Sequence, residues 1–382
     1  MTASCRPRIL LLIPRLGGGG AQRVTELLAR HLSPQSYELH LGTILACSTE
    51  TQTREEFPPW VTLHRLEARR VRAAAWPLLR LLRRLQPDLI LCGMAYLNFL
   101  VLLLRPLLPR SVRIVVRQNG TVSAALAFGG QPFYTRLLYK LLYPRADRIV
   151  CQSRAMAEDL ARMVRVPAAR LAVLPNPIEI EAIRAVAAEA SSTAASASIW
   201  SGAGPRLLAV GRLSGEKGFD LLLQALGAVR LRFPSIELAV AGAGEEEDRL
   251  RTQAKRLGLE DTVHFLGAVA DPAALFPGID LFVLASRHEG LPNALLEAAA
   301  AGLPLLSTPA SGGIVELLQD RPGCWLAAQA SAAALTAGLL AALGALEPRQ
   351  RFPHPFIDAF DVECAVQAYA DLIDSVLREP AR

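Results

Sequence analysis

An apolar run, a short loop and a helix are predicted in this order between residues 279 and 302. Residues 279–284 are apolar apart from Asp280 and too few for a helix, so they suit a buried strand. Pro292 fits the first turn of a helix, where its missing N–H costs nothing. Gly302 and Pro304 are expected to end this helix about three turns later. The loop therefore lies at the carboxyl end of a strand, the edge where open α/β sheets bind ligands.

Two glutamates flank the start of this helix. Glu289 lies in the loop and Glu297 eight positions later, so at about 100° per residue they do not share a helix face. The free N–H groups of residues 293–296 are predicted to hold phosphate oxygens. Glu289 and Glu297 could then accept hydrogen bonds from hydroxyls on either side of the phosphate. This pattern suits a diphosphate with a sugar at each end. The plainer alternative is a solvated loop residue and an exposed helix residue.

The size and composition of the chain suit two domains in a reducing compartment. Its 382 residues are 52% hydrophobic, which is enough for a core in each domain. The six cysteines are widely spaced without a CxxC pair, which argues against a disulfide scaffold or a zinc site. The apolar runs at 9–13 and 99–104 are too short for a signal peptide or a membrane span. We therefore expect a cytoplasmic protein.

The charge is divided unevenly between the two halves. Residues 1–190 carry 26 Lys and Arg against 13 Asp and Glu, whereas residues 191–382 carry 15 against 22. The basic half is expected to meet an anionic partner, such as a lipid surface or a phosphorylated acceptor. Arginines and leucines alternate over 63–85 around Trp76, which favours a basic amphipathic helix on an anionic membrane. An ordinary surface helix is the alternative. Nucleic acid fits poorly, because aromatic residues are only 6%.

Strands, glycine-rich loops and helices alternate through both halves. A strand at 8–13, four glycines and a helix at 22–31 form a phosphate-binding arrangement, although neither GxGxxG nor the P-loop motif is present. In the second half, a strand at 206–210 precedes a loop with two cations, Arg212 and Lys217. Two cations after a strand could neutralise a diphosphate. His264 lies in an apolar run and is expected to be a core histidine.

The chain resembles retaining glycosyltransferase family 4 (glycosyl transferases group 1), of the bacterial envelope polysaccharide type, in five segments: GGGGAQRV, AVLPNPI, AVGRLSGEKGFDLLLQA, VHFLG and EGLPNALLEAAAAGLP. The last segment holds the family's E-x7-E signature. The resemblance implies an α/β fold of GT-B architecture, in which two Rossmann-like, doubly wound domains face a central cleft. The expected parts are an acceptor-binding domain (1–184), an Ala/Ser-rich linker (185–205), a nucleotide-sugar domain (206–355) and a final helix that packs back on the first domain (356–382).

The resemblance also implies roles for individual residues. The donor would be a nucleotide-sugar, expected to be a UDP-sugar, whose diphosphate Arg212 and Lys217 would bind. Glu297 would hold the ribose hydroxyls and Glu289 the hydroxyls of the donor sugar. The implied site is completed by three sets of residues: Gly290, Leu291, Asn293, Ala294 and Leu295 beside the phosphates, Leu266 and Gly267 near the base, and Gly18 and Gly19 at the border of the cleft.

One position departs from the family pattern. Many members have a histidine in the loop that corresponds to residues 117–120, and here Asn119 takes that place. Asparagine can hydrogen-bond but cannot act as a base. We therefore expect front-side displacement, in which the departing diphosphate oxygen takes the acceptor proton. The family implies no metal and no cofactor beyond the nucleotide-sugar substrate.

Three functions remain open at this point. The first is transfer of a sugar to a glycan or lipid-linked acceptor in envelope polysaccharide assembly, with possible contact to the inner face of the cell membrane. The second is an epimerase or phosphorylase on a related fold. The third is a non-catalytic scaffold, against which the retention of Arg212, Lys217, Glu289 and Glu297 argues.

Overall fold

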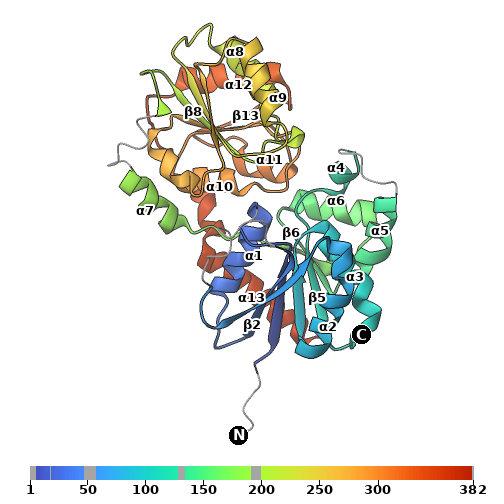
Figure 1. Ribbon diagram of the computed structural model, residues 1–382. Coiled ribbons are helices and arrows are strands. Elements are labelled where there is room, and N and C mark those ends of the chain that lie inside the picture. Colours follow the sequence, from blue (N-terminus) through green and yellow to red (C-terminus); the bar gives the residue numbers. More distant parts are fainter. Residues whose placement is uncertain (1–5, 18, 47–56, 128–133, 191–198, 381–382) are drawn as a thin grey trace. The chain divides into compact units, whose positions relative to one another are not determined.

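The computed structural model describes residues 6–17, 19–46, 57–127, 134–190 and 199–380. The chain divides into two compact units. Unit 1 consists of Met1–Pro177 and Val362–Arg382, and unit 2 consists of Ile178–Asp361. Each unit is described below by itself (Figure 1).

Unit 1 is built on a parallel sheet. Among its described residues the sheet has seven strands in the order β3-β2-β1-β4-β5-β6-β7. The strands are β1 (Arg8–Ile13), β2 (Glu38–Leu45), β3 (Val61–Ala68), β4 (Leu89–Cys92), β5 (Arg113–Arg117), β6 (Arg148–Cys151) and β7 (Leu171–Val173). The strand order reverses between β1 and β4, which is the switch point typical of doubly wound folds.

Helices cover both faces of this sheet (Figure 1). Leu10 and Leu12 of β1 pack in one core, whereas Ile9 and Leu11 pack in another, because successive side chains of a strand point to opposite faces. One face carries α2 (Ala75–Leu85), α3 (Ala95–Leu104), α4 (Val122–Ala127), α5 (Tyr134–Leu142) and α6 (Arg154–Val164). The other carries α1 (Gly20–His31) and α13 (Val362–Arg378). Short 3₁₀ helices lie at η2 (Val71–Ala74), η3 (Arg105–Leu107), η4 (Tyr143–Arg145) and η5 (Ala168–Arg170).

The last helix of the chain, α13, is bound into unit 1 along its length. Tyr369, Ile373 and Val376 are fully buried in the core that they share with α1. The hydroxyl of Tyr37 donates to the carboxylate of Asp374 over 2.7 Å. This helix therefore completes the core of unit 1, although the whole of unit 2 separates it from the rest of that unit in the sequence.

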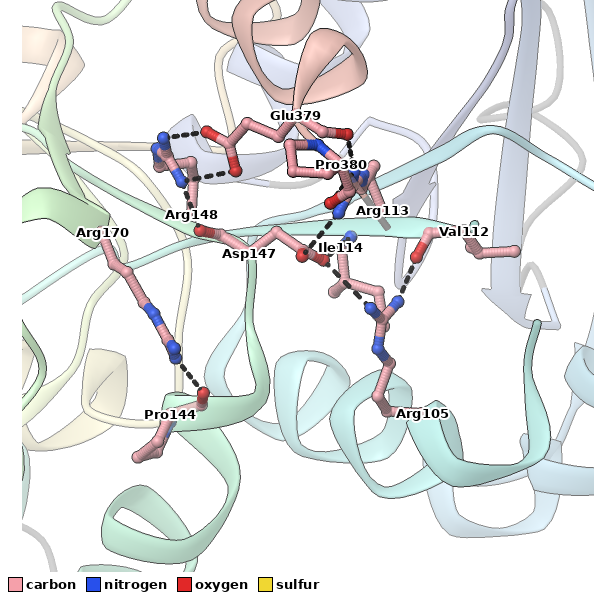
Figure 2. A network of polar contacts seen from close by, with 10 residues as sticks. All are labelled: Arg105, Val112, Arg113, Ile114, Pro144, Asp147, Arg148, Arg170, Glu379 and Pro380. Atoms are coloured by element: carbon pink, nitrogen blue, oxygen red, sulfur yellow. Dashed lines mark hydrogen bonds and ion pairs between the residues drawn. The ribbon is translucent and has the colours of Figure 1, made fainter. Parts of the chain in front are cut away.

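A polar network holds the end of α13 (Figure 2). The guanidinium of Arg113 donates to the carbonyl oxygens of Glu379 and Pro380, and Arg148 forms an ion pair with the Glu379 carboxylate. Beneath them Asp147 is 1% exposed and accepts the N–H of Ile114 at 2.8 Å. Because Asp147 also lies 3.5 Å from Arg113, a buried carboxylate orients the arginine that holds the chain end.

Unit 2 has a second parallel sheet, in the order β10-β9-β8-β11-β12-β13. Its strands are β8 (Arg206–Val210), β9 (Glu237–Ala241), β10 (Val263–Gly267), β11 (Leu281–Leu284), β12 (Leu305–Ser307) and β13 (Cys324–Leu326). One face is covered by α8 (Phe219–Val229), α9 (Glu247–Arg256) and α12 (Ala332–Ala345). The opposite face is covered by α7 (Ile180–Ala190), α10 (Asn293–Ala300) and α11 (Gly312–Leu318), with the 3₁₀ helices η8 (Pro272–Gly278) and η9 (Pro355–Phe360). A further 3₁₀ helix, η7 (Gly215–Lys217), follows β8.

The arginine-rich stretch at 63–85 is not a single helix, so that prediction is wrong. Residues 61–68 form the edge strand β3, which pairs with β2 from Leu39↔Val61 to Leu45↔Ala68. Only residues 75–85 form the α-helix α2, whose Leu78, Leu79 and Leu82 are buried in the core. Pairing with β2 satisfies the backbone of residues 61–68 and outweighs their helix-like pattern of charges.

The segments that join the units also differ from the sequence expectation. Residues 180–190, assigned partly to the first domain and partly to the linker, form α7, whose Ile180 and Ile183 are buried in unit 2. Ile199 and Trp200, from the end of the predicted linker, also pack on that core. Residues 191–198 of the predicted linker lie outside the described residues. At the far end, residues 356–360 form a 3₁₀ helix of unit 2, and α13 begins at Val362.

Candidate active site

The loop after β8 places two cations at the carboxyl edge of the unit 2 sheet, and their surroundings differ. The side chain of Arg212 is 65% exposed and donates to Glu216 over 2.7 Å. The side chain of Lys217 is only 21% exposed, and its Nζ lies 2.6 Å from the Oε1 of Glu289. Lys217 is therefore held in position, whereas Arg212 makes only an exposed surface pair.

The loop after β11 supplies the carboxylate that meets Lys217. The Glu289 side chain is 9% exposed, and its Oε1 also accepts the Ser286 hydroxyl at 2.6 Å. The Glu289 N–H donates to the carbonyl of Ala310 at 3.1 Å. Because β8 and β11 are parallel neighbours, with Leu207 opposite Leu281, the two loops emerge at the same edge. Parallel pairing thus brings together a cation and a carboxylate that are 72 positions apart.

Glu297 lies inside α10 and is 9% exposed. Together with the low exposure of Glu289, this rules out the plainer alternative of a solvated loop residue and an exposed helix residue. A carboxylate loses its hydration when it is buried, so it is found where hydrogen bonds replace the lost water. Both carboxylates are therefore largely shielded from bulk water, and Glu289 is bonded to Lys217 and Ser286.

The start of α10 differs from the sequence expectation. Pro292 is the N-cap residue, and its carbonyl accepts the N–H groups of Leu295 at 3.2 Å and Leu296 at 3.4 Å. These two N–H groups complete the first turn and do not point to a ligand, so the prediction for 293–296 is wrong at its last two positions. Gly290, Leu291 and Asn293 are buried, Ala294 is half-buried, and Ser311 donates to the Gly290 carbonyl at 2.6 Å.

The helix α10 is also shorter than expected, since it ends at Ala300. Gly302 follows with a φ of +72°, a left-handed conformation that favours glycine. The N–H of Leu303 then returns to the carbonyl of Ala298 at 3.0 Å. These bonds end the helix after about two turns.

Glycine loops pack closely around the ends of β8, β9 and β10. A Cβ added to Gly218, whose φ is +65°, would lie 2.1 Å from the carbonyl oxygen of Ala285. A Cβ added to Gly242 would lie 1.8 Å from the Gly211 carbonyl oxygen. Leu266 and Gly267 are half-buried at the end of β10, and the Gly267 carbonyl accepts the N–H of Gly242 at 2.7 Å. These contacts fix the backbone of the edge that carries Lys217 and Glu289.

In unit 1 the residues predicted to border the acceptor lie after β1 and β5. Gly18 lies outside the described residues, whereas Gly19 is exposed and forms the N-cap of α1. Asn119 is half-buried, and its amide is bound at both ends: Nδ2 donates to the Gly93 carbonyl, and Oδ1 accepts from Arg117 and from Gln152 at 3.2 Å. The side chain of Asn119 is thus part of the structure of unit 1.

Sequence reasoning missed two arginines. Arg117 is 1% exposed and donates to Tyr369 at 3.1 Å and Asn176 at 2.5 Å, and so binds α13 and residue 176 to β5. Its signal was a charge at the end of an apolar strand. Arg287 forms a two-bond ion pair with Asp220, with both distances 2.7 Å. It lies two residues before Glu289, just ahead of the signature segment.

The charged groups of this edge affect one another's ionisation. Burial raises the pKa of Asp220, but the hydrogen bonds and charge of Arg287 outweigh it, and the net pKa lies below its ordinary value. The hydrogen bonds that Arg287 donates to the Asp220 carboxylate raise the pKa of Arg287. Burial lowers the pKa of His288, which favours its neutral imidazole. His264, on the edge strand β10, bonds to Glu237 over 2.6 Å, so its hydrogen bonding is satisfied as predicted, but its side chain is 24% exposed and does not lie in the core.

Among the described residues, no three His, Cys, Asp or Glu side chains gather in a way that could hold a metal ion. In the same ranges, no helix combines the length and the apolar character needed to cross a bilayer.

Two family models match successive stretches of the chain. The model of glycosyltransferase family 4 matches residues 18–182, and the model of glycosyl transferases group 1 matches residues 196–353. The chain belongs to this glycosyltransferase family. Solved structures agree on the GT-B fold. Anabaena HepE in complex with UDP and glucose has a TM-score of 0.80 at 19% identity over 97% of this chain and 100% of that one. Sucrose-phosphate synthase from Thermosynechococcus elongatus has a TM-score of 0.81 at 16% identity over 97% and 99%.

Two relatives have names that refer to bacterial glycan assembly. A Campylobacter jejuni N-acetylgalactosaminyltransferase that acts on a diphospho-undecaprenol glycan is 28% identical over 322 residues, 81% of this chain and 83% of the relative. The lipopolysaccharide core biosynthesis glycosyltransferase LpsE of Rhizobium meliloti is 31% identical over 53% of this chain. The matched stretches span 54% of LpsE and 38% of an uncharacterized Haemophilus influenzae glycosyltransferase that is 34% identical.

Proposed function

We propose that this glycosyltransferase moves a hexose from a UDP-sugar to a lipid-linked or polysaccharide acceptor in cell-envelope glycan biosynthesis, with retention of the anomeric configuration. The observation that carries the proposal is the contact between Lys217 and Glu289 at the carboxyl ends of β8 and β11, together with the burial of Glu297 in the helix that follows β11. One half-buried cation and two poorly exposed carboxylates suit a ligand that combines a diphosphate with sugar hydroxyls.

Each side chain then has a separate task in binding the donor. Lys217 neutralises the diphosphate, and its ammonium stabilises the charge that develops on the leaving oxygen. Glu289 accepts hydrogen bonds from the hydroxyls of the transferred sugar, and Glu297 accepts them from the hydroxyls of the ribose. Arg212 reaches the diphosphate by leaving Glu216, an exposed pair that is worth at most about 1 kcal/mol. UDP as the nucleotide is supported by HepE, which was solved with UDP and glucose.

The acceptor is inferred from the relatives. The Campylobacter enzyme is named for a diphospho-undecaprenol acceptor, and LpsE for the lipopolysaccharide core. An acceptor carried on a lipid diphosphate also agrees with the excess positive charge of residues 1–190. The direct test is to supply the purified chain with UDP-hexoses and polyprenyl-diphosphate-linked sugars and to look for an extended glycolipid. If the UDP-sugar is consumed with water as the sole acceptor, the transfer proposal is wrong.

The expected mechanism is front-side displacement without a protein base at position 119. The amide of Asn119 cannot act as a base, and both its Nδ2 and its Oδ1 are already hydrogen-bonded within unit 1. The bond between the anomeric carbon and the diphosphate oxygen breaks while the acceptor oxygen attacks from the same face. The acceptor proton passes to the departing oxygen, and Lys217 stabilises its charge.

The configuration of the product tests this mechanism. With an α-linked donor we predict an α-linked product, because attack occurs from the face that the leaving group vacates. Proton NMR of the anomeric signal measures the outcome. A β-linked product would require attack from the opposite face by an activated acceptor, and would contradict the proposed mechanism.

We also propose peripheral contact with the inner face of the cell membrane, through helix α5. Its Tyr134, Leu137 and Leu141 recur at helical spacing and are 50%, 54% and 57% exposed. Arg136 and Lys140 are exposed beside them. An apolar stripe beside a basic stripe suits the surface of an anionic bilayer. This surface replaces the one predicted at 63–85.

We predict that the double substitution L137E/L141E lowers binding to anionic vesicles at least tenfold, since burial of one leucine is worth about 1.5–3 kcal/mol. Flotation with phosphatidylglycerol vesicles measures it. The control is L231E, because Leu231 is 88% exposed but lies in unit 2. Equal loss in both variants, or no salt-sensitive binding by the unchanged chain, would count against contact through α5.

A further inference from the structure

We propose that Arg287 is a positioning residue, which joins the loop after β11 to the loop after β8 and so sets Lys217 against Glu289. The inference rests on the proposed function and deepens it, because it assigns the placement of the two charges to a residue outside the donor-binding set.

The first part of the link is the ion pair between Arg287 and Asp220. Nη1 and Nη2 each lie 2.7 Å from a different oxygen of the carboxylate. The side chains are 27% and 16% exposed, so water screens this pair less than a surface pair. Asp220 is in the first turn of α8, where a negative charge is favoured, and its carbonyl accepts the Gln253 side chain of α9 at 2.8 Å. The pair thus attaches the loop after β11 to two packed helices.

The second part of the link acts on the loop that carries Lys217. The same Nη1 of Arg287 donates to the Gly215 carbonyl at 2.8 Å, and the Arg287 N–H donates to the Glu216 carbonyl at 2.8 Å. These are the two residues directly before Lys217. Directly after it, Gly218 lies so close to the Ala285 carbonyl that no Cβ would fit. The backbone of Lys217 is therefore fixed on both sides by the loop after β11.

The geometry accounts for an arginine at this position. One guanidinium meets both carboxylate oxygens and a carbonyl at once, which a single ammonium cannot do with the same directions. Glu289 follows Arg287 by two residues, so one movement of this loop displaces the carboxylate relative to the cation. A displacement of about 1 Å in such a group can cost about 100-fold in rate.

The test measures UDP affinity and transfer turnover in R287A, R287K and D220N. We expect R287A and D220N to lower turnover by about 100-fold, and R287K by about tenfold because it keeps the charge but not the two-bond geometry. The control is K255A, since Lys255 is 75% exposed on α9 and its Nζ lies 3.9 Å from Glu260. Loss of an exposed pair of this kind is expected to change turnover by no more than about twofold.

A double substitution separates positioning from general destabilisation. If Arg287 acts through Lys217 and Glu289, adding R287A to a chain that already carries K217A should lower turnover by less than about threefold. Full additivity of the two losses, or wild-type turnover in folded R287K and D220N, would overturn the inference. The inference is also overturned if the wild-type chain binds UDP and R287A has the same UDP affinity and the same turnover. If the wild-type chain itself ignores UDP, the proposed function fails instead, and the assignment of Arg287 fails with it.

Discussion

Replacement of Lys217 with alanine is expected to lower transfer turnover by about 100- to 1,000-fold, the usual effect of removing one preorganised charge from a developing anion. Lys217 is suited to this role because it is 21% exposed and fixed at 2.6 Å from Glu289. Arg212 is held less firmly, since its side chain is 65% exposed and has to leave Glu216 before it reaches the diphosphate. Turnover under saturating donor, followed by release of UDP, measures the effect.

The control for this variant is K255A. Lys255 is 75% exposed on α9, with its Nζ 3.9 Å from Glu260, so its loss should leave turnover unchanged. The turnover of R212A should lie between those of K217A and K255A, because Arg212 is not held in place before the donor binds. If K217A retained turnover within about threefold of wild type, the assignment of the diphosphate to this loop would be wrong.

Deletion of residues 362–382 is expected to unfold unit 1. The deletion removes Val366, Tyr369, Ile373 and Val376 from the core that covers one face of the sheet. At about 1.5–3 kcal/mol for each buried side chain, the loss is about 6–12 kcal/mol. Domains are stable by only about 5–15 kcal/mol, so the remainder of unit 1 should lose its protease resistance. Limited proteolysis followed by mass spectrometry identifies the surviving fragment.

A shorter truncation after Arg378 is the matched control. It removes Glu379 and Pro380, the partners of Arg113 and Arg148 in Figure 2, but keeps the buried face of α13. Unit 1 should then stay folded with reduced stability. If the longer deletion left unit 1 as resistant as the full chain, α13 would not be an integral part of its core.

Buried parallel strands were the part of the fold that the sequence predicted best. Residues 8–13 and 206–210 are strands with the expected bounds, because strands inside a parallel sheet are covered on both faces and are near-continuous apolar runs. Edge strand β3 was missed for the converse reason. It pairs with β2 alone, and its half-exposed residues include charges whose spacing resembles that of a helix.

The candidate site was predicted in its residues but not in its contacts. The motifs named Lys217 and Glu289, yet their contact depends on the pairing of β8 with β11, which no local pattern specifies. The N–H groups of Leu295 and Leu296 were predicted as ligand donors, because the sequence did not show that Pro292 would be the N-cap residue and accept both. Arg287 carries no motif of its own, and only its four hydrogen bonds in the folded unit reveal it.

The most direct test of the account is a screen of nucleotide-sugars for thermal stabilisation and turnover, with K217A and E297A as controls. We predict that one donor stabilises the wild-type chain, by about 2.7 kcal/mol at a concentration of 100 Kd, and is turned over. Both effects should be lost in the two variants. A wild-type chain that no nucleotide-sugar stabilises, or a donor whose effect survives both substitutions, would contradict the assignment of this edge of unit 2 as the donor site.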